Sequence, residues 1–191
     1  MRKLTAHMYT TLDGRAEFPE YPSEAPTGKP DPAFQEMWID RYDSVDTLLF
    51  GKTAYETHFA YWTPSKRTAK DPPFIHDFSR WKEAVPKVVI SNSLKKAEWN
   101  NTRVMKGDLA GIVAKLKKEP GKDMILEGGP NITQQFVEKG LIDDYRIVVM
   151  PVILGKGLNW FGALPKQETL KLVSCKSLVD GELVLHYEAR R

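Results

Sequence analysis

The amino-acid sequence predicts an α/β fold with a mainly parallel central sheet covered by helices on both faces, which makes three layers. Apolar runs typical of buried strands alternate with helical patterns through most of the chain. The last part differs, because two strand patterns at 170–178 and 183–189 are joined at Asp180-Gly181, a pair typical of tight hairpins. We therefore expect a C-terminal antiparallel hairpin beside the parallel strands.

Each element follows from local patterns. Residues 33–42 place apolar side chains at helical spacing, and Asp108 is a typical N-cap for the apolar stripe that follows it. Residues 18–31 are rich in Pro, Glu and Gly and predict a long loop. The remaining strands are predicted at 3–10, 47–50, 87–91, 124–126 and 147–150, and the helices at 33–42, 53–59, 74–83, 109–116 and from 130 to Gly140.

Composition narrows the possible functions. The chain has 191 residues, a length typical of one domain, and we expect residues 1–191 to form a single domain. Its 28 basic and 25 acidic residues are too evenly balanced for a nucleic-acid binder. No run approaches the ~18 apolar residues of a membrane span, and the first residues lack the pattern of a signal peptide. We expect a cytoplasmic protein without nucleic-acid or membrane partners.

Metal and disulfide chemistry are not indicated. The single cysteine, Cys175, cannot form a disulfide or a cysteine-based zinc site within one chain, and we expect it to be buried in a strand. The four histidines show no ligand spacing, so we assign them structural or surface roles and expect no metal site. These are His7, His58, His76 and His186.

The most informative segment is a strand that ends in Glu127-Gly128-Gly129. Pro130 follows at the position of a first helical residue, and Gly140 stands where the helix should stop. Two glycines at a helix N-terminus let the backbone approach an anion, which the free N–H groups and the helix dipole then hold. A phosphate or pyrophosphate site is the functional interpretation, and a tight turn without a ligand is the alternative.

Two other strand ends carry similar signals. The strand at 47–50 leads into Gly51-Lys52-Thr53, although the spacing of a Walker A loop is absent. The strand at 87–91 leads into Ser91-Asn92. Ligands of open α/β sheets bind outside the carboxyl ends of the strands. Three such ends in one domain favour a bound nucleotide more than any single end does.

A series of ordered motifs resembles a known family. The chain is similar to the dihydrofolate reductase fold and, more closely, to the reductase domain of the bifunctional riboflavin-biosynthesis deaminase-reductase and its stand-alone bacterial relatives. The segments that carry the resemblance are TLDGR at 11–15, LLFGKTAYE at 48–56, YW at 61–62, KVVIS at 87–91, the unit from Glu127-Gly128-Gly129 to Asp143-Asp144, and PVILGKGLNWF at 151–161.

The resemblance implies a dihydrofolate reductase-like three-layer sandwich and an NADPH-dependent reductase. The implied activity resembles that of 5-amino-6-(5-phosphoribosylamino)uracil reductase, with hydride transfer to a small pteridine- or pyrimidine-like substrate. Ala54 stands where the family has a threonine. The residues implied at the cofactor are Gly51, Lys52 and Thr53 for the phosphates, Ser91 and Asn92 for the adenosine ribose phosphate, and Gly128, Gly129, Pro130, Asn131 and Ile132 for the pyrophosphate.

An acid near the nicotinamide would assist the reaction, and the main candidates are Asp13 and Glu127. The position of Glu127 resembles a substrate-contacting glutamate of the riboflavin reductases, whereas Asp13 has a turn-capping role as its alternative. Glu36 is a looser candidate that could equally be a solvated helix charge. Trp38 and Trp62 line a pocket for a flat ring or belong to the core.

Several alternatives stay open at this point. The zinc motif of the deaminase half is absent, and residues 15–29 lack a match to the phosphosugar-binding residues of the family. A true dihydrofolate reductase and a non-catalytic nucleotide-binding module are therefore the other possible functions. We also expect a homodimer with Trp160 and Phe161 at its interface, the alternative being that these aromatic side chains fold onto the monomer core.

Overall fold

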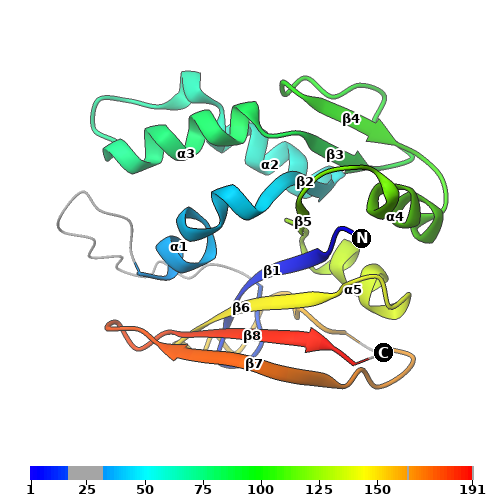
Figure 1. Ribbon diagram of the computed structural model, residues 1–191. Coiled ribbons are helices and arrows are strands. Elements are labelled where there is room, and N and C mark those ends of the chain that lie inside the picture. Colours follow the sequence, from blue (N-terminus) through cyan, green and yellow to red (C-terminus); the bar gives the residue numbers. More distant parts are fainter. Residues whose placement is uncertain (17–31, 163, 191) are drawn as a thin grey trace.

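The fold is built on one sheet, whose strand order is β4-β3-β2-β5-β1-β6-β8-β7 (Figure 1). The computed structural model describes residues 1–16, 32–162 and 164–190. The strands are β1 (Leu4–Thr11), β2 (Val45–Gly51), β3 (Lys87–Ile90), β4 (Thr102–Met105), β5 (Asp123–Leu126), β6 (Asp144–Met150), β7 (Leu170–Ser177) and β8 (Leu183–Ala189). The helices are α1 (Pro32–Met37), η1 (Ile39–Ser44), α2 (Lys52–Trp62), η2 (Pro64–Lys66), α3 (Pro73–Ala84), α4 (Leu109–Lys118) and α5 (Pro130–Glu138).

The pairing confirms the expected sheet. In the sheet, the six strands β4, β3, β2, β5, β1 and β6 all pair parallel with their neighbours. Strand β8 pairs antiparallel with both β6 and β7. The hairpin between β7 and β8 turns at Gly181, whose φ of +86° lies in the region that favours glycine. The α/β class and the C-terminal antiparallel hairpin are both confirmed.

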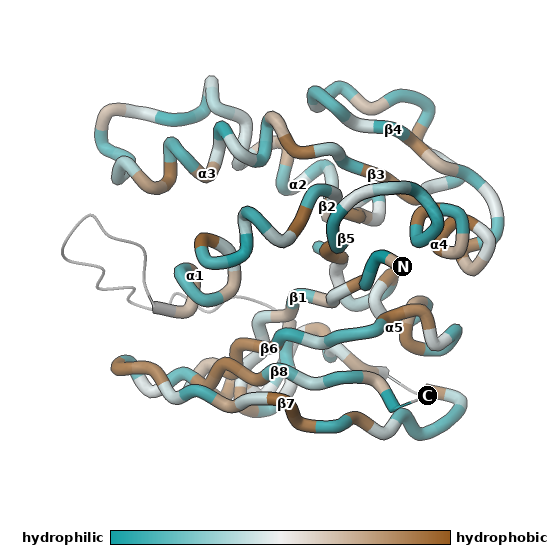
Figure 2. Tube along the Cα trace, viewed as in Figure 1, coloured by the Kyte–Doolittle hydropathy of each residue, from teal (hydrophilic) through white to brown (hydrophobic). Residues whose placement is uncertain are grey.

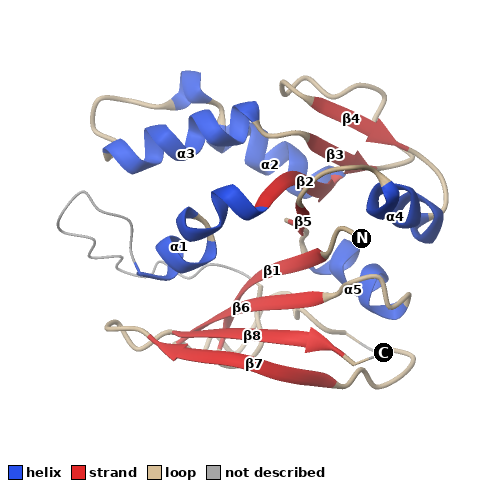
Figure 3. Ribbon diagram, viewed as in Figure 1, coloured by secondary structure: helices blue, strands red, loops and turns tan. Residues whose placement is uncertain are grey.

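The sheet is covered on both faces, and its strands separate two apolar cores. Leu4, Ala6 and Met8 of β1 alternate toward the core that contains residues of α4 and α5. Leu48 and Phe50 of β2 point to the opposite core, which contains residues of α1, α2 and α3. Figure 3 shows helices on either side of the strands. This alternation is what a sheet buried on both faces requires.

Some local details differ from expectation. The helix expected at 33–42 is divided into α1 and the 3₁₀ helix η1. Asp108 caps α4 as expected, because its carboxylate accepts the Gly111 N–H at 2.8 Å. Strand β4 was not predicted, since it has only four residues, pairs with β3 alone and exposes Arg103. The loop expected at 18–31 lies outside the described residues.

The outer strand β7 corrects the expectation for Cys175. This residue is exposed rather than buried, because β7 is the last strand of the sheet and its residues 171–177 are exposed. Leu172 and Val173 on the same strand are 51% and 47% exposed. Figure 2 shows the resulting hydrophobic stretch along β7.

Of the two alternatives for Trp160, the structure supports packing onto the monomer core. Its side chain is 6% exposed, and its indole Nε1 donates to the Tyr9 carbonyl at 2.7 Å. The Trp160 backbone N–H donates to Gly14 O at 3.1 Å, which ties the loop after β6 to the turn after β1. Trp160 therefore belongs to the monomer core, whereas Phe161 is 43% exposed. The homodimer stays a prediction that light scattering of the purified chain tests.

Candidate active site

The three glycine- and serine-bearing strand ends lie side by side. Strands β3, β2 and β5 are consecutive and parallel, so their carboxyl ends meet at one edge of the sheet. Gly51 pairs with Ile90, the residue before Ser91. Leu126, the residue before Glu127, pairs with Leu49 two residues before Gly51. The sequence motifs are therefore brought together as predicted.

One isoleucine packs against two of these turns. A Cβ added to Gly51 would lie 3.1 Å from Ile132 Cδ1, and a Cβ added to Gly128 would lie 2.6 Å from Ile132 Cγ2. A side chain at Gly128 would therefore force a shift in the first turn of α5, whereas one at Gly51 would need only a small movement of Ile132. The Ile132 side chain packs against both turns, and so the starts of α2 and α5 lie close together.

Gly129 is different, because a Cβ at this position would meet no atom within 4 Å. Gly129 is the N-cap of α5 with extended φ and ψ angles of −75° and 174°, and no side chain caps the helix there. Helix α2 likewise starts after Gly51 without a side-chain cap. Two adjacent helix starts with uncapped N–H groups favour an anionic ligand.

The far end of α5 also matches the sequence. Gly140 has a φ of +60°, and its N–H donates to Val137 O while the Leu141 N–H donates to Phe136 O. These two bonds form a Schellman motif. Pro130 stands at the start of the helix as predicted. The unit of strand, glycine turn, helix and stop is therefore confirmed.

The polar residues around the turns have defined local partners. Lys52 is exposed and lies 3.8 Å from Glu56 on the next turn of α2. Ser91 Oγ accepts the Leu94 N–H at 3.1 Å, and Asn92 Oδ1 accepts the Gly107 N–H at 3.2 Å. The two side chains after β3 thus shape their turn. Two further residues assigned to the cofactor from the sequence are exposed, namely Thr53 and Asn131.

Glu127 is held by a buried lysine that the sequence analysis did not single out. Lys82 Nζ from α3 donates to both carboxylate oxygens, at 2.7 and 2.6 Å. His58 of α2 completes the group, with its Nδ1 3.0 Å from Lys82 Nζ and 3.3 Å from Glu127 Oε2. Burial, followed by the Lys82 charge, lowers the pKa of His58, so its neutral ring accepts the third ammonium hydrogen.

Aromatic rings surround the Lys82 ammonium. Nζ lies 4.9 Å from the Trp38 ring centroid, 5.2 Å from that of Phe78 and 5.5 Å from that of Trp62. Cations are stabilised over aromatic faces, and more strongly where water is excluded. Trp38 is buried and Trp62 is half-buried. Both tryptophans thus pack around this ion pair, which supports their assignment to the core.

Asp13 is tied to the loop that follows β6. Its carboxylate accepts a hydrogen bond from Thr11 Oγ1 at 2.7 Å, from the Leu154 N–H at 3.1 Å and from the Gly155 N–H at 2.8 Å. Arg15 Nε lies 3.3 Å away. The bond from Thr11, with those from the two N–H groups and Arg15, places the pKa of Asp13 well below its usual range. This geometry supports its role in the turn.

Neither candidate acid holds a proton near neutral pH. Burial alone would raise the pKa of Glu127, but the interactions with Lys82 and His58 together outweigh burial and lower that pKa to about 2. Asp13 is likewise held as a carboxylate. Both groups can accept hydrogen bonds and orient their surroundings. Their assignment as catalytic residues stays a prediction.

The lowered pKa of Glu127 predicts a loss of stability in acid. A carboxyl group with a depressed folded-state pKa contributes stability above its unfolded pKa, and this contribution is lost as pH falls toward the folded pKa. For Glu127 the window runs from 4.5 down to about 2. We expect the melting temperature to fall across it, and to fall less in the double variant Lys82→Met/Glu127→Leu. Equal falls in the two proteins would contradict this assignment.

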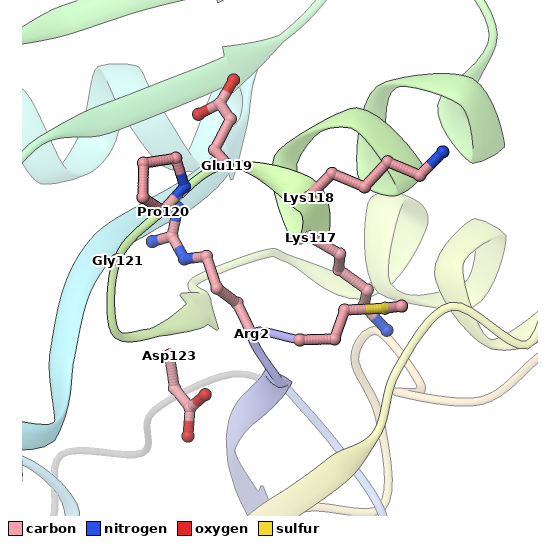
Figure 4. Close-up of a pocket in the computed structure, with 8 residues that line it drawn as sticks. Arg2, Lys117, Lys118, Glu119, Pro120, Gly121 and Asp123 are labelled. Atoms are coloured by element: carbon pink, nitrogen blue, oxygen red, sulfur yellow. The ribbon is translucent and has the colours of Figure 1, made fainter.

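A hollow at the other end of the sheet is not part of this site (Figure 4). It lies around the start of β1 and the loop before β5 and includes Arg2 and Lys117. Those charges are already neutralised, because Arg2 pairs with Asp46 and Lys117 Nζ lies 2.5 Å from Asp143. The described residues form no cluster suited to a metal ion, and among them no helix is both long and apolar enough to span a membrane.

Lys82 and His58 were missed because each is a single polar residue within a helix. In α3, Lys82 follows Phe78 by four residues and occupies the same buried face. A lysine on an otherwise apolar helix face was the available signal, since such a charge must find a buried partner. The identity of that partner depends on the packing of α3 beside the end of β5.

The fold is of the dihydrofolate reductase type. Enterococcus faecalis dihydrofolate reductase complexed with NADP(H) is similar with a TM-score of 0.58 and 12% identity, over 99% of this chain and 97% of that chain. A putative riboflavin biosynthesis protein from Shewanella is similar with a TM-score of 0.72 and 20% identity, over 99% of both chains. These likenesses confirm the expected three-layer architecture.

The sequence comparisons then give the family. The model of the RibD C-terminal domain matches residues 2–184, so the chain belongs to the RibD C-terminal domain family. The Bacillus subtilis protein YyaP, which is uncharacterized, is 27% identical over 188 residues, covering 97% of this chain and 95% of YyaP. The resemblance stated from the ordered motifs is therefore confirmed.

Proposed function

We propose that the protein is an NADPH-dependent reductase that transfers a hydride to a small pteridine- or pyrimidine-like substrate. The observation that carries the proposal is the pair of uncapped helix starts after Gly51 and Gly129, packed on one isoleucine at a shared sheet edge. This arrangement suits a ligand with several phosphate groups. Membership in the RibD C-terminal domain family supports the same activity.

The residues present fit such a cofactor. Gly128, Gly129 and Asn131 would hold the pyrophosphate at the start of α5, and Lys52 offers a cation at the start of α2. The open space beside Gly129 leaves its backbone approachable. Ser91 and Asn92, which follow the neighbouring strand β3, would meet the adenosine ribose phosphate.

The cofactor supplies the hydride when bound, and the protein positions the reacting rings. The Lys82–Glu127 pair fixes the end of β5 directly before the glycine turn. The hydrogen bonds of Asp13 fix the loop after β6 relative to the turn after β1. Because both carboxylates are ionised, their proposed roles are to accept hydrogen bonds and to orient neighbouring groups.

Turnover separates the proposed reductase from a non-catalytic nucleotide-binding module. NADPH fluorescence should fall when the chain is mixed with the cofactor and an accepted pyrimidine or pteridine. A dihydrofolate reductase would turn over dihydrofolate. Glu36, the looser acid candidate, is paired with Lys176 at 2.8 Å. Cofactor binding without turnover of any tested heterocycle would favour the binding module.

Lys52→Ala should weaken NADPH binding more than NADH binding, by about 1–2 kcal/mol, because a charge-assisted contact to the extra phosphate is removed. The stability of the fold should hardly change, since Lys52 is exposed and its ion pair with Glu56, at 3.8 Å, lies on the surface. Calorimetric titration of both cofactors measures the difference. Lys118→Ala, at the opposite end of the sheet, is the control, and equal losses for the two cofactors would argue against this role.

A further inference from the structure

The proposed reduction needs a proton as well as a hydride, and neither candidate acid carries one. Hydride addition to a carbon–nitrogen or carbon–oxygen double bond moves the electron pair of that bond onto the nitrogen or oxygen, which is then protonated. The carboxyl groups of Asp13 and Glu127 are both ionised near neutral pH, because the pKa of each is lowered. A different proton donor is therefore needed, either a side chain or water.

His58 lies beside both glycine turns. Its Nδ1 is 3.3 Å from Oε2 of Glu127, the residue directly before the turn that begins α5. Its ring centroid is 5.3 Å from that of Phe50, the residue directly before the turn that begins α2. The side chain of His58 is 28% exposed, whereas those of Glu127 and Lys82 are 4% and 1% exposed. Of this group, His58 is therefore the member that a substrate can reach.

Lys82 fixes which ring nitrogen of His58 carries the hydrogen. Lys82 Nζ lies 3.0 Å from His58 Nδ1, and it also donates to both carboxylate oxygens of Glu127. An ammonium group only donates hydrogen bonds, so Nδ1 acts as the acceptor and bears no hydrogen. The hydrogen of the neutral ring is then on Nε2, the nitrogen that is not engaged with the ion pair.

The charges around His58 favour this neutral ring. Burial, followed by the Lys82 charge, lowers the pKa of His58, and the Glu127 charge opposes this effect. The same two charges act on His7 of β1, whose pKa burial lowers well below its usual range. A neutral imidazole N–H donates a hydrogen bond and gives up its proton only when negative charge develops on the acceptor. The His58 ring is thus suited to the moment of hydride transfer.

We propose that His58 is a catalytic residue whose Nε2–H hydrogen-bonds to the acceptor nitrogen or oxygen of the substrate and protonates it, with Lys82 as the positioning residue. This role rests on the proposed reductase function. The Nε2–H bond breaks as the new N–H or O–H bond forms, and a proton passes from Lys82 Nζ to Nδ1 over 3.0 Å. A solvent proton then returns to Nε2, and the Nδ1 proton goes back to the Lys82 amine. The substrate gains the hydride supplied by NADPH, which leaves as NADP⁺, and one proton that solvent replaces.

His58→Gln tests the catalytic role. Glutamine keeps an oxygen that can accept from Lys82, but its amide does not transfer a proton. We expect kcat for NADPH oxidation with dihydrofolate or 5-amino-6-(5-phosphoribosylamino)uracil to fall about 100-fold or more, the usual contribution of general acid–base catalysis. NADPH affinity and the melting temperature should stay near those of the wild type. His76→Gln, which changes a histidine of α3 that contacts the Thr68 carbonyl at 3.0 Å, is the control and should keep the wild-type kcat.

Nitrogen NMR of the histidine side chains tests the positioning role without cofactor or substrate. Near neutral pH the His58 signals, assigned by their absence in His58→Gln, should be those of a neutral ring with its hydrogen on Nε2. In Lys82→Met/Glu127→Leu, which removes the donor to Nδ1, the ring should exchange between its two tautomers. A hydrogen on Nδ1, or an imidazolium, in the wild type would overturn the proposal.

The outcomes separate this role from the reductase function. Wild-type kcat in His58→Gln would overturn the role of His58 and leave the reductase standing, with water as the proton donor. A wild type that binds NADPH but turns over neither probe would overturn both. Added imidazole should raise kcat of His58→Ala, because it replaces the lost proton donor. A kcat that stays low despite imidazole and returns in His58→Phe would show that the ring only packs, and would overturn the proposal.

Discussion

Lys82→Met is expected to destabilise the protein by about 3–5 kcal/mol, the usual cost of removing one partner of a buried ion pair. The variant leaves the Glu127 carboxylate buried without the two hydrogen bonds of 2.7 and 2.6 Å that it accepts from Lys82. It also removes the cation from between the Trp38 and Phe78 rings. Urea unfolding followed by circular dichroism measures the loss.

The double variant Lys82→Met/Glu127→Leu distinguishes an uncompensated charge from lost packing. Replacing both partners of a buried pair by apolar groups is often neutral or stabilising, so most of the stability should return. Lys118→Met, which changes a lysine at the hollow of Figure 4, should stay near the wild type. A single variant within about 1 kcal/mol of the wild type would mean that the pair is not the anchor described here.

Gly129→Val is expected to lower NADPH affinity at least about tenfold while the protein stays folded. The extended φ and ψ angles of Gly129 suit a β-branched residue, and its Cβ would meet no atom within 4 Å. The new methyl groups would therefore fill the space in which the pyrophosphate meets the backbone. Calorimetric titration measures affinity, and circular dichroism checks the fold.

Two glycine variants serve as matched comparisons. Gly128→Ala should destabilise the fold, because its Cβ would lie 2.6 Å from Ile132 Cγ2 and 2.9 Å from Thr133 Oγ1. Gly111→Ala in α4, where the added Cβ would make only an ordinary contact at 3.5 Å, should change neither stability nor NADPH affinity for the worse. Unchanged NADPH affinity in folded Gly129→Val would show that the turn is only structural.

The sheet and the glycine turns could be predicted from sequence because their signals are local. Pro130 and Gly140 bracket α5, and both positions follow from backbone preferences that any context retains. The meeting of the three strand ends also followed, since parallel strands place their carboxyl ends at one edge. The order of these strands could not be predicted from such local signals, and it is β3, β2, β5.

The ion pair at Glu127 could not be predicted, because Lys82 is 45 residues away in sequence. Its partner is chosen by how α3 packs on the sheet. Long sequence separation also explains Trp160, whose buried indole donates a hydrogen bond to the Tyr9 carbonyl in the first strand. Cys175 was misjudged because an apolar strand pattern does not show whether a strand lies at the centre or edge of a sheet.

Titration of NADPH and NADH into the wild-type chain tests the central claim most directly. The two uncapped helix starts and the cation at Lys52 predict saturable binding of NADPH, with NADH bound more weakly for lack of the extra phosphate. Binding should follow one site per chain. Equal affinity for the two cofactors, or binding of neither, would contradict the account of this sheet edge as an NADPH site.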